Sequence, residues 1–167
     1  MFRSKNAGRP PLRAWALTSA KSRRMSGTHE TVVAFDFGLR RIGVAVGQQV
    51  THSATPLGII KNDKDGPDWN AIERLLREWQ PARLIVGMPA HTDGSRTDIA
   101  GDVEQFIVHL RRFERPIETI DERYSSIEAE ELLKTARARG SSGRIHKDMI
   151  DSTAAELIAE RWLSKIG

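Results

Sequence analysis

The stretch TVVAFDFGLRRIGVAV, residues 31–46, contains two apolar runs separated by Gly38-Leu39-Arg40. Both runs are rich in the β-branched and aromatic residues that favour strands, and a three-residue connection is short enough for an antiparallel hairpin. Asp36 lies within the first run and is its one acidic residue. A buried carboxylate without a partner costs several kcal/mol, so Asp36 requires a metal ion, a basic partner or solvent.

The elements downstream of this hairpin alternate between strand and helix patterns. The spacing of the apolar residues predicts further strands over 54–60, 82–88 and 116–120, and helical segments over 69–79, 99–110, 125–136 and 150–162. The last two helical segments are separated by a Gly-Ser-Ser-Gly break at 140–143. The order, βββαβαβα, predicts an α/β fold in which helices cover both faces of a mixed sheet.

The charge of the chain is unevenly distributed. Of the 26 basic residues, seven lie within residues 1–29, which have no acidic residue, and 19 basic residues remain against 22 acidic ones from Glu30 onward. The net charge of +4 is therefore weak evidence for nucleic-acid binding. We expect a basic, disordered extension over 1–29 and one domain over 30–167. A nucleic-acid-binding arm, a transit peptide and a gene start at Met25 are the alternatives for the extension.

Composition excludes several classes of protein. The chain has no cysteine, which excludes disulfides, thiolate zinc sites and a cysteine nucleophile. No apolar run approaches the roughly 20 residues that span a bilayer, and the first residues lack the apolar core of a secretory signal. We therefore expect a soluble intracellular protein with no membrane partner.

Three acidic positions are candidates for a shared site. Asp121 and Glu122 end the last predicted strand, where alternation directs their side chains to opposite faces, so only one can easily join Asp36. Asp151 borders the apolar face of the last helix. Carboxylates converging from separate elements suit Mg²⁺ or Mn²⁺ and the two-metal hydrolysis of a phosphodiester. The structural alternatives are a turn-capping Asp36 and a solvated strand end at Asp121-Glu122-Arg123.

Residues 31–167 resemble the YqgF/RuvX family of the RNase H-like superfamily. The resemblance rests on four motifs in order: FDFGLRRIGVAV at 35–46, IVGMP at 85–89 leading to DGS at 93–95, DERYSSIEAE at 121–130 and IDSTAA at 150–155. It implies a five-stranded RNase H-like sheet, a cytoplasmic location and a nuclease that matures the 5′ end of pre-16S ribosomal RNA. A Holliday junction resolvase acting on four-way DNA is the alternative activity.

The resemblance also implies roles for individual residues. Asp36 corresponds to the first catalytic carboxylate, the Asp121-Glu122 pair to the second and Asp151 to the third, with Asp36, Glu122 and Asp151 as ligands of Mg²⁺ or Mn²⁺. The expected nucleic-acid contacts are Arg40, Arg41 and Arg123. Two departures are visible: Tyr124 stands where relatives have Leu or Ile, and residues 82–88 lack the acid that resolvases of the RuvC kind carry on the central strand.

Other function classes are compatible with parts of the pattern. Sugar kinases and actin-like ATPases also open with an Asp-x-Gly hairpin, but they need two such lobes and this chain has room for one. A non-catalytic nucleic-acid-binding module would bind its ligand tightly without metal-dependent cleavage. A homodimer would suit the resolvase alternative, because a four-way junction has two-fold symmetry.

Overall fold

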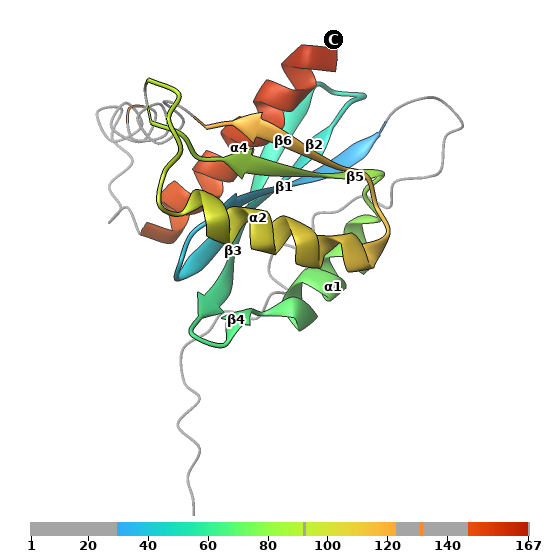
Figure 1. Ribbon diagram of the computed structural model, residues 1–167. Coiled ribbons are helices and arrows are strands. Elements are labelled where there is room, and N and C mark those ends of the chain that lie inside the picture. The colour runs from blue at the N-terminus through green and yellow to red at the C-terminus, as the bar shows by residue number, and fades with distance from the viewer. Residues whose placement is uncertain (1–29, 92, 123–130, 132–146, 167) are drawn as a thin grey trace, which may run out of the picture.

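The structure, a computed structural model, describes residues 30–91, 93–122, 131 and 147–166 (Figure 1). The predicted N-terminal extension over 1–29, Arg123 and all of the predicted helix over 125–136 except Glu131 lie outside these residues. None of the helices within the described ranges is long and apolar enough to cross a membrane.

A mixed sheet of six strands forms the centre of the fold, in the order β4-β3-β2-β1-β5-β6 (Figure 1). Strands β1 to β4 pair antiparallel, and β5 and β6 run parallel to β1. The predicted hairpin is confirmed, with Asp36 of β1 opposite Gly43 of β2. The strands are β1 Thr31–Phe37, β2 Arg41–Gln48, β3 Ser53–Asp63, β4 Gly66–Pro67, β5 Arg83–Met88 and β6 Ile117–Asp121.

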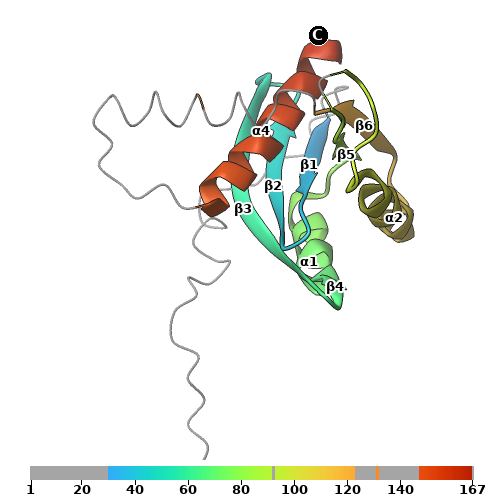
Figure 2. The same ribbon diagram turned by 60° about the vertical axis from the view of Figure 1, so that its left-hand side comes forward.

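Helices cover both faces of the sheet, as predicted. Helices α1 and α2 lie on one face and the long helix α4 lies on the other (Figure 2). Their bounds are α1 Trp69–Trp79, α2 Ala100–Leu110 and α4 Lys147–Ile166. Asp68 caps α1 by accepting a hydrogen bond from the main-chain N–H of Ala71, as its position before the apolar pattern predicted.

The sheet differs from the expected one in a single strand. Five strands were expected, and β3, β2, β1, β5 and β6 supply them. The additional strand, β4, has only two residues, Gly66 and Pro67, which pair with the end of β3 at Asp63 and Asn62. Two residues are too few to show any periodicity, so the sequence pattern could not predict this strand.

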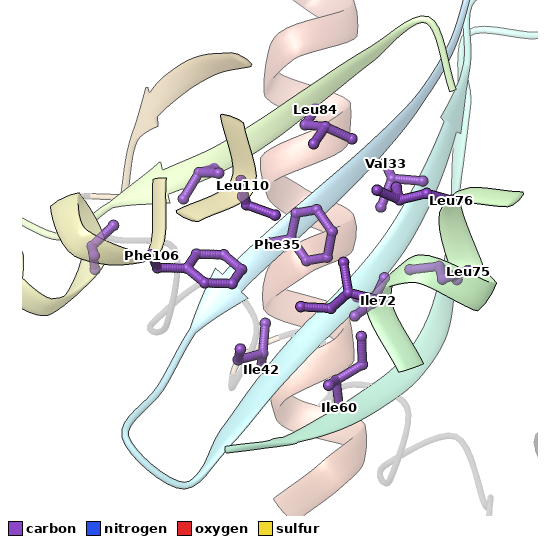
Figure 3. Close-up of a cluster of buried hydrophobic side chains, with 13 residues drawn as sticks. Val33, Phe35, Ile42, Ile60, Ile72, Leu75, Leu76, Leu84, Phe106 and Leu110 are labelled. Atoms are coloured by element: carbon purple, nitrogen blue, oxygen red, sulfur yellow. The ribbon is translucent and has the colours of Figure 1, made fainter. Parts of the chain in front are cut away.

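Alternation along β1 divides the buried side chains into two clusters. Val33 and Phe35 pack with α1 and α2, where the Phe35 and Phe106 rings meet edge to face at 5.7 Å between centroids (Figure 3). Val32 and Ala34 pack against α4 on the opposite face. Asp36 continues the second series, so the strand directs it to the face that α4 covers.

Small residues of β2 let α4 lie close to the sheet. A Cβ atom on Gly43 would lie 1.9 Å from the main-chain oxygen of Asp151, so no side chain fits at this position while α4 stays in place. A Cβ on Gly47 would lie 3.4 Å from Cβ of Ala159 in α4. The absence of a side chain at Gly43 therefore allows Asp151 to approach the end of β1.

We expect Gly43→Ala to lower the free energy of unfolding by about 1–3 kcal/mol, the usual cost of overpacking a core. The clash is with helix backbone, which cannot rotate away as a side chain can. Urea denaturation checks this, with Gly101→Ala in α2 as the control, because a Cβ there would lie 3.9 Å from its nearest neighbour, Nη2 of Arg96. Equal midpoints for wild type and Gly43→Ala would contradict the close approach of α4.

Candidate active site

Asp36 and Glu122 meet across the end of β5. Asp36 lies near the end of β1, and Glu122 directly follows β6, its main-chain N–H donating to the Met88 oxygen at 3.1 Å. The Glu122 side chain lies over Gly87 of β5, where a Cβ would be only 1.8 Å from Oε1. Strand β5 separates β1 from β6, so the missing side chain at Gly87 lets Glu122 reach across to Asp36.

Burial determines the ionisation of this pair. Burial raises the pKa of Asp36, the hydrogen bond from Glu122 lowers it, and the negative charge of Asp151 raises it. Burial also raises the pKa of Glu122 to about 10, assisted by the charge of Asp36 and by the hydrogen bond between the two carboxyl groups. At neutral pH, therefore, Glu122 is protonated and donates to Asp36.

Asp151 brings a third carboxylate to the same place from α4. Oδ2 of Asp151 lies 3.1 Å from Nε of Arg41, and the two side chains form an ion pair. Both side chains are about one-quarter exposed. Its charge also acts on Asp36, as the pKa of that residue shows. Glu122 is thus hydrogen-bonded to Asp36, and Asp151 lies close enough for its charge to act on Asp36. We refer to Asp36, Glu122 and Asp151 together as the carboxylate group.

Asp121 is directed away from this carboxylate group, although its negative charge also raises the pKa of Glu122. It is exposed, and strand alternation directs its side chain away from the face that holds Glu122. Its main-chain oxygen accepts a hydrogen bond from Nη1 of Arg161 at 2.9 Å. The pattern predicted that only one of the two neighbours would join Asp36, and the structure places Glu122 there.

Two of the three predicted cationic contacts, Arg40 and Arg41, lie at the start of β2 within the described residues. Arg40 is exposed at the turn between β1 and β2, and Arg41 begins β2 and pairs with Asp151. Arg123 lies outside the described residues. The pairing of Arg41 with Asp151 had no signal in the sequence, because the two residues are 110 positions apart.

The chemistry of the carboxylate group suits a hard divalent cation. Carboxylates are the side chains that Mg²⁺ and Mn²⁺ prefer, and Oε1 of Glu122 is buried with no hydrogen-bond partner among the residues that the structure describes. Among the described residues, however, no three acidic or histidine side chains already converge around a common point that could hold a metal ion. The Glu122 side chain is hydrogen-bonded to Asp36, and Asp151 forms an ion pair with Arg41. A cation that binds here would therefore have to displace the proton of Glu122 and compete with Arg41 for Asp151.

Two features of the site were not anticipated from the sequence. Gly87 had a visible signal, since a glycine inside a buried strand often marks a close approach by another group. Arg161, whose positive charge lowers the pKa of Glu122 against the effect of burial, lies on α4 with no distinguishing pattern around it.

Comparisons with known proteins place the chain among named relatives. A protein of Saccharophagus degradans named "Putative pre-16S rRNA nuclease" is 43% identical over 136 residues, which cover 81% of this chain and 94% of the relative. A protein of Nitrosococcus oceani with the same name is 44% identical over 135 residues, which cover 80% of this chain and 86% of the relative. A structure of Thermus thermophilus RuvC in complex with a Holliday junction substrate is 17% identical with a TM-score of 0.49, covering 82% of this chain and 96% of that one.

A family model also matches most of the chain. The model described as "RuvX: Holliday junction resolvase" matches residues 30–165, a range that includes Asp36, Glu122 and Asp151. With this match and relatives above 40% identity over four-fifths of the chain, the chain belongs to the RuvX family.

Proposed function

We propose that this protein is a metal-dependent nuclease that hydrolyses nucleic-acid phosphodiesters, with the 5′ end of pre-16S ribosomal RNA as its substrate. The observation that carries the proposal is the hydrogen-bonded pair of Asp36 on β1 and Glu122 at the end of β6, with the charge of Asp151 on α4 acting on Asp36. The names of the relatives agree with this activity. We further propose that the enzyme is cytoplasmic and that residues 30–167 form the nuclease domain, preceded by a basic extension.

Asp36, Glu122 and Asp151 would hold Mg²⁺ or Mn²⁺. Such a cation supplies positive charge that polarises the phosphodiester and helps water to ionise. Glu122 must give up the proton it donates to Asp36 before its carboxylate can act as a ligand, and burial makes this step costly without an incoming positive charge. Asp151 would have to weaken its ion pair with Arg41 in order to bind the cation. The Arg41 guanidinium would then be available to a substrate phosphate.

The test compares two substrates under the same conditions. Purified protein is incubated with pre-16S RNA carrying its unprocessed 5′ end and with a four-way DNA junction, each with Mg²⁺, Mn²⁺ or EDTA. We expect metal-dependent cleavage of the RNA. Cleavage of the junction alone would favour the resolvase alternative, which the description of the matching family names. Binding of both substrates without cleavage in any metal would refute the nuclease proposal and indicate a binding module.

Arg40 and Arg41 are proposed to contact the phosphate backbone, together with Arg123. We expect Arg40→Gln and Arg41→Gln each to weaken RNA binding and to make its salt dependence shallower by about 0.7 in the log–log slope, the value for one phosphate contact on a single strand. Fluorescence anisotropy at several KCl concentrations measures this. A slope that neither variant changes would show that both arginines serve the fold.

The ion pair predicts a difference between these two variants. Arg41 neutralises Asp151, whereas Arg40 is exposed at the neighbouring turn, so Arg41→Gln removes a cation that competes with the metal. We expect Arg41→Gln to bind Mg²⁺ several-fold more tightly than wild type and Arg40→Gln to bind it unchanged, as titration calorimetry without nucleic acid would show. Equal Mg²⁺ affinities for the three proteins would contradict the competition.

A further inference from the structure

A pocket of about 420 Å³ lies between β6 and α4. Ile120 and Leu157 give it apolar walls, and Arg161, Ser164 and Lys165 of α4 give it a polar rim. Strand β6 is at the edge of the sheet, and α4 lies across one face of the sheet (Figure 2). The pocket therefore lies at the β6 edge of the sheet, where its lining includes Asp121, the residue that precedes Glu122.

Arg161 joins this pocket to the carboxylate group. Its Nη1 donates to the main-chain oxygen of Asp121 at 2.9 Å, which fixes the guanidinium at the end of β6. Its charge lowers the pKa of the neighbouring Glu122, although burial raises that pKa by more. One guanidinium thus borders both the pocket and a proposed metal ligand.

Positive charge consequently flanks the carboxylate group on two sides. Arg41 of β2 pairs with Asp151 on one side, and Arg161 lies by Glu122 on the other. In the sheet, β2 and β6 lie on opposite sides of the adjacent strands β1 and β5. A nucleic-acid strand whose scissile phosphate lies at the carboxylates would therefore pass from one arginine to the other along the ends of the strands.

We propose that Arg161 and Lys165 bind a backbone phosphate of the nucleic-acid substrate adjacent to the scissile one, in the pocket between β6 and α4. This assignment rests on the proposed nuclease function. A phosphodiester suits the rim because arginine and lysine donate charge-assisted hydrogen bonds to phosphate oxygens. The apolar walls at Ile120 and Leu157 suit the sugar or base edge attached to that phosphate.

Acidic groups near the pocket limit what it can bind. Glu160 and Asp121 also line it, so its local charge is balanced and a free multivalent anion would gain little there. A phosphate tethered to a strand that is already held at the carboxylates arrives at a high effective concentration. The pocket therefore contributes affinity for a long strand and none for inorganic phosphate.

The test measures binding of single-stranded RNA by anisotropy at several KCl concentrations, with Ca²⁺ replacing Mg²⁺. We expect Arg161→Gln and Lys165→Gln each to weaken binding several-fold and to reduce the salt slope by about 0.7, one phosphate contact on a single strand. Lys165→Gln serves as a second probe because Lys165 is exposed in the last turn of α4, where its replacement spares the fold. Arg77→Gln is the control, since Arg77 is exposed on α1 and pairs with Glu73.

Shortened oligonucleotides locate the contact. We expect the difference between wild type and Arg161→Gln to vanish when the RNA is shortened from one end and to persist when it is shortened from the other. Wild-type salt slopes in both variants, or an equal effect of trimming from either end, would overturn the assignment. A protein that shows the expected slopes but cleaves nothing with Mg²⁺ or Mn²⁺ would refute the nuclease proposal while supporting phosphate binding in this pocket.

Discussion

Asp36→Asn is expected to abolish metal-dependent cleavage and to raise the melting temperature of the metal-free protein. The variant removes one anionic ligand at nearly constant volume, and loss of several kcal/mol of transition-state stabilisation lowers the rate by roughly three orders of magnitude. Burial and the charge of Asp151 both raise the pKa of Asp36, so ionised Asp36 is unfavourable in the folded state. The asparagine carries no charge, and its oxygen still accepts the hydrogen bond from Glu122.

Two matched variants sharpen this experiment. Asp121→Asn changes an exposed carboxylate one residue from Glu122, and we expect it to cleave RNA within about two-fold of wild type, since surface substitutions are usually within ±0.5 kcal/mol. Asp151→Asn should lose cleavage as Asp36→Asn does, but without a gain in stability, because it also loses the ion pair with Arg41.

The outcomes separate a metal ligand from a structural aspartate. Activity and melting temperature are measured for each variant with Mg²⁺ and with EDTA. If Asp36→Asn melted lower than wild type and kept activity in proportion to its folded fraction, Asp36 would be a structural residue. If cleavage were lost in Asp121→Asn and retained in the other two variants, the carboxylate group would not be the active site.

Local pattern was sufficient to predict most of the fold. The hairpin of β1 and β2 and the buried strand β5 have long apolar runs with clear turn signals, and the structure contains them. Alternation along β1 also predicts which side chains face α4. Strand β4 was missed because its pairing depends on the position of β3 and not on its own two residues.

The arrangement of the site could not be predicted from the local sequence pattern alone. The motifs singled out Asp36, Glu122 and Asp151 through a resemblance, but their meeting depends on the order of the strands and on the empty space above Gly87. The ion pair between Arg41 and Asp151 depends on how α4 lies across β2. Neither contact leaves a trace in the sequence near those residues, because both join elements that are distant along the chain.

The metal-free protein is expected to lose stability as the pH rises from about 4.5 towards about 10, and Glu122 is the cause. The pKa of Glu122 is raised from 4.5 to about 10 in the folded protein, mainly by burial. Between these values the unfolded chain is ionised at this position while the folded protein keeps its proton, so unfolding releases a proton. Each pH unit in this window then lowers the free energy of unfolding by up to about 1.4 kcal/mol.

Glu122→Gln isolates this effect, because glutamine cannot ionise in either state yet can donate a hydrogen bond to Asp36. We expect the variant and wild type to have similar stability below pH 4.5 and the variant to be the more stable one at pH 8, both in EDTA by urea denaturation. Mg²⁺ should stabilise wild type more at pH 8 than at pH 6, because metal binding requires Glu122 to lose its proton. It should stabilise Glu122→Gln little at either pH. Parallel stability curves for the two proteins from pH 4.5 to 9 would show that Glu122 is already ionised in the folded protein.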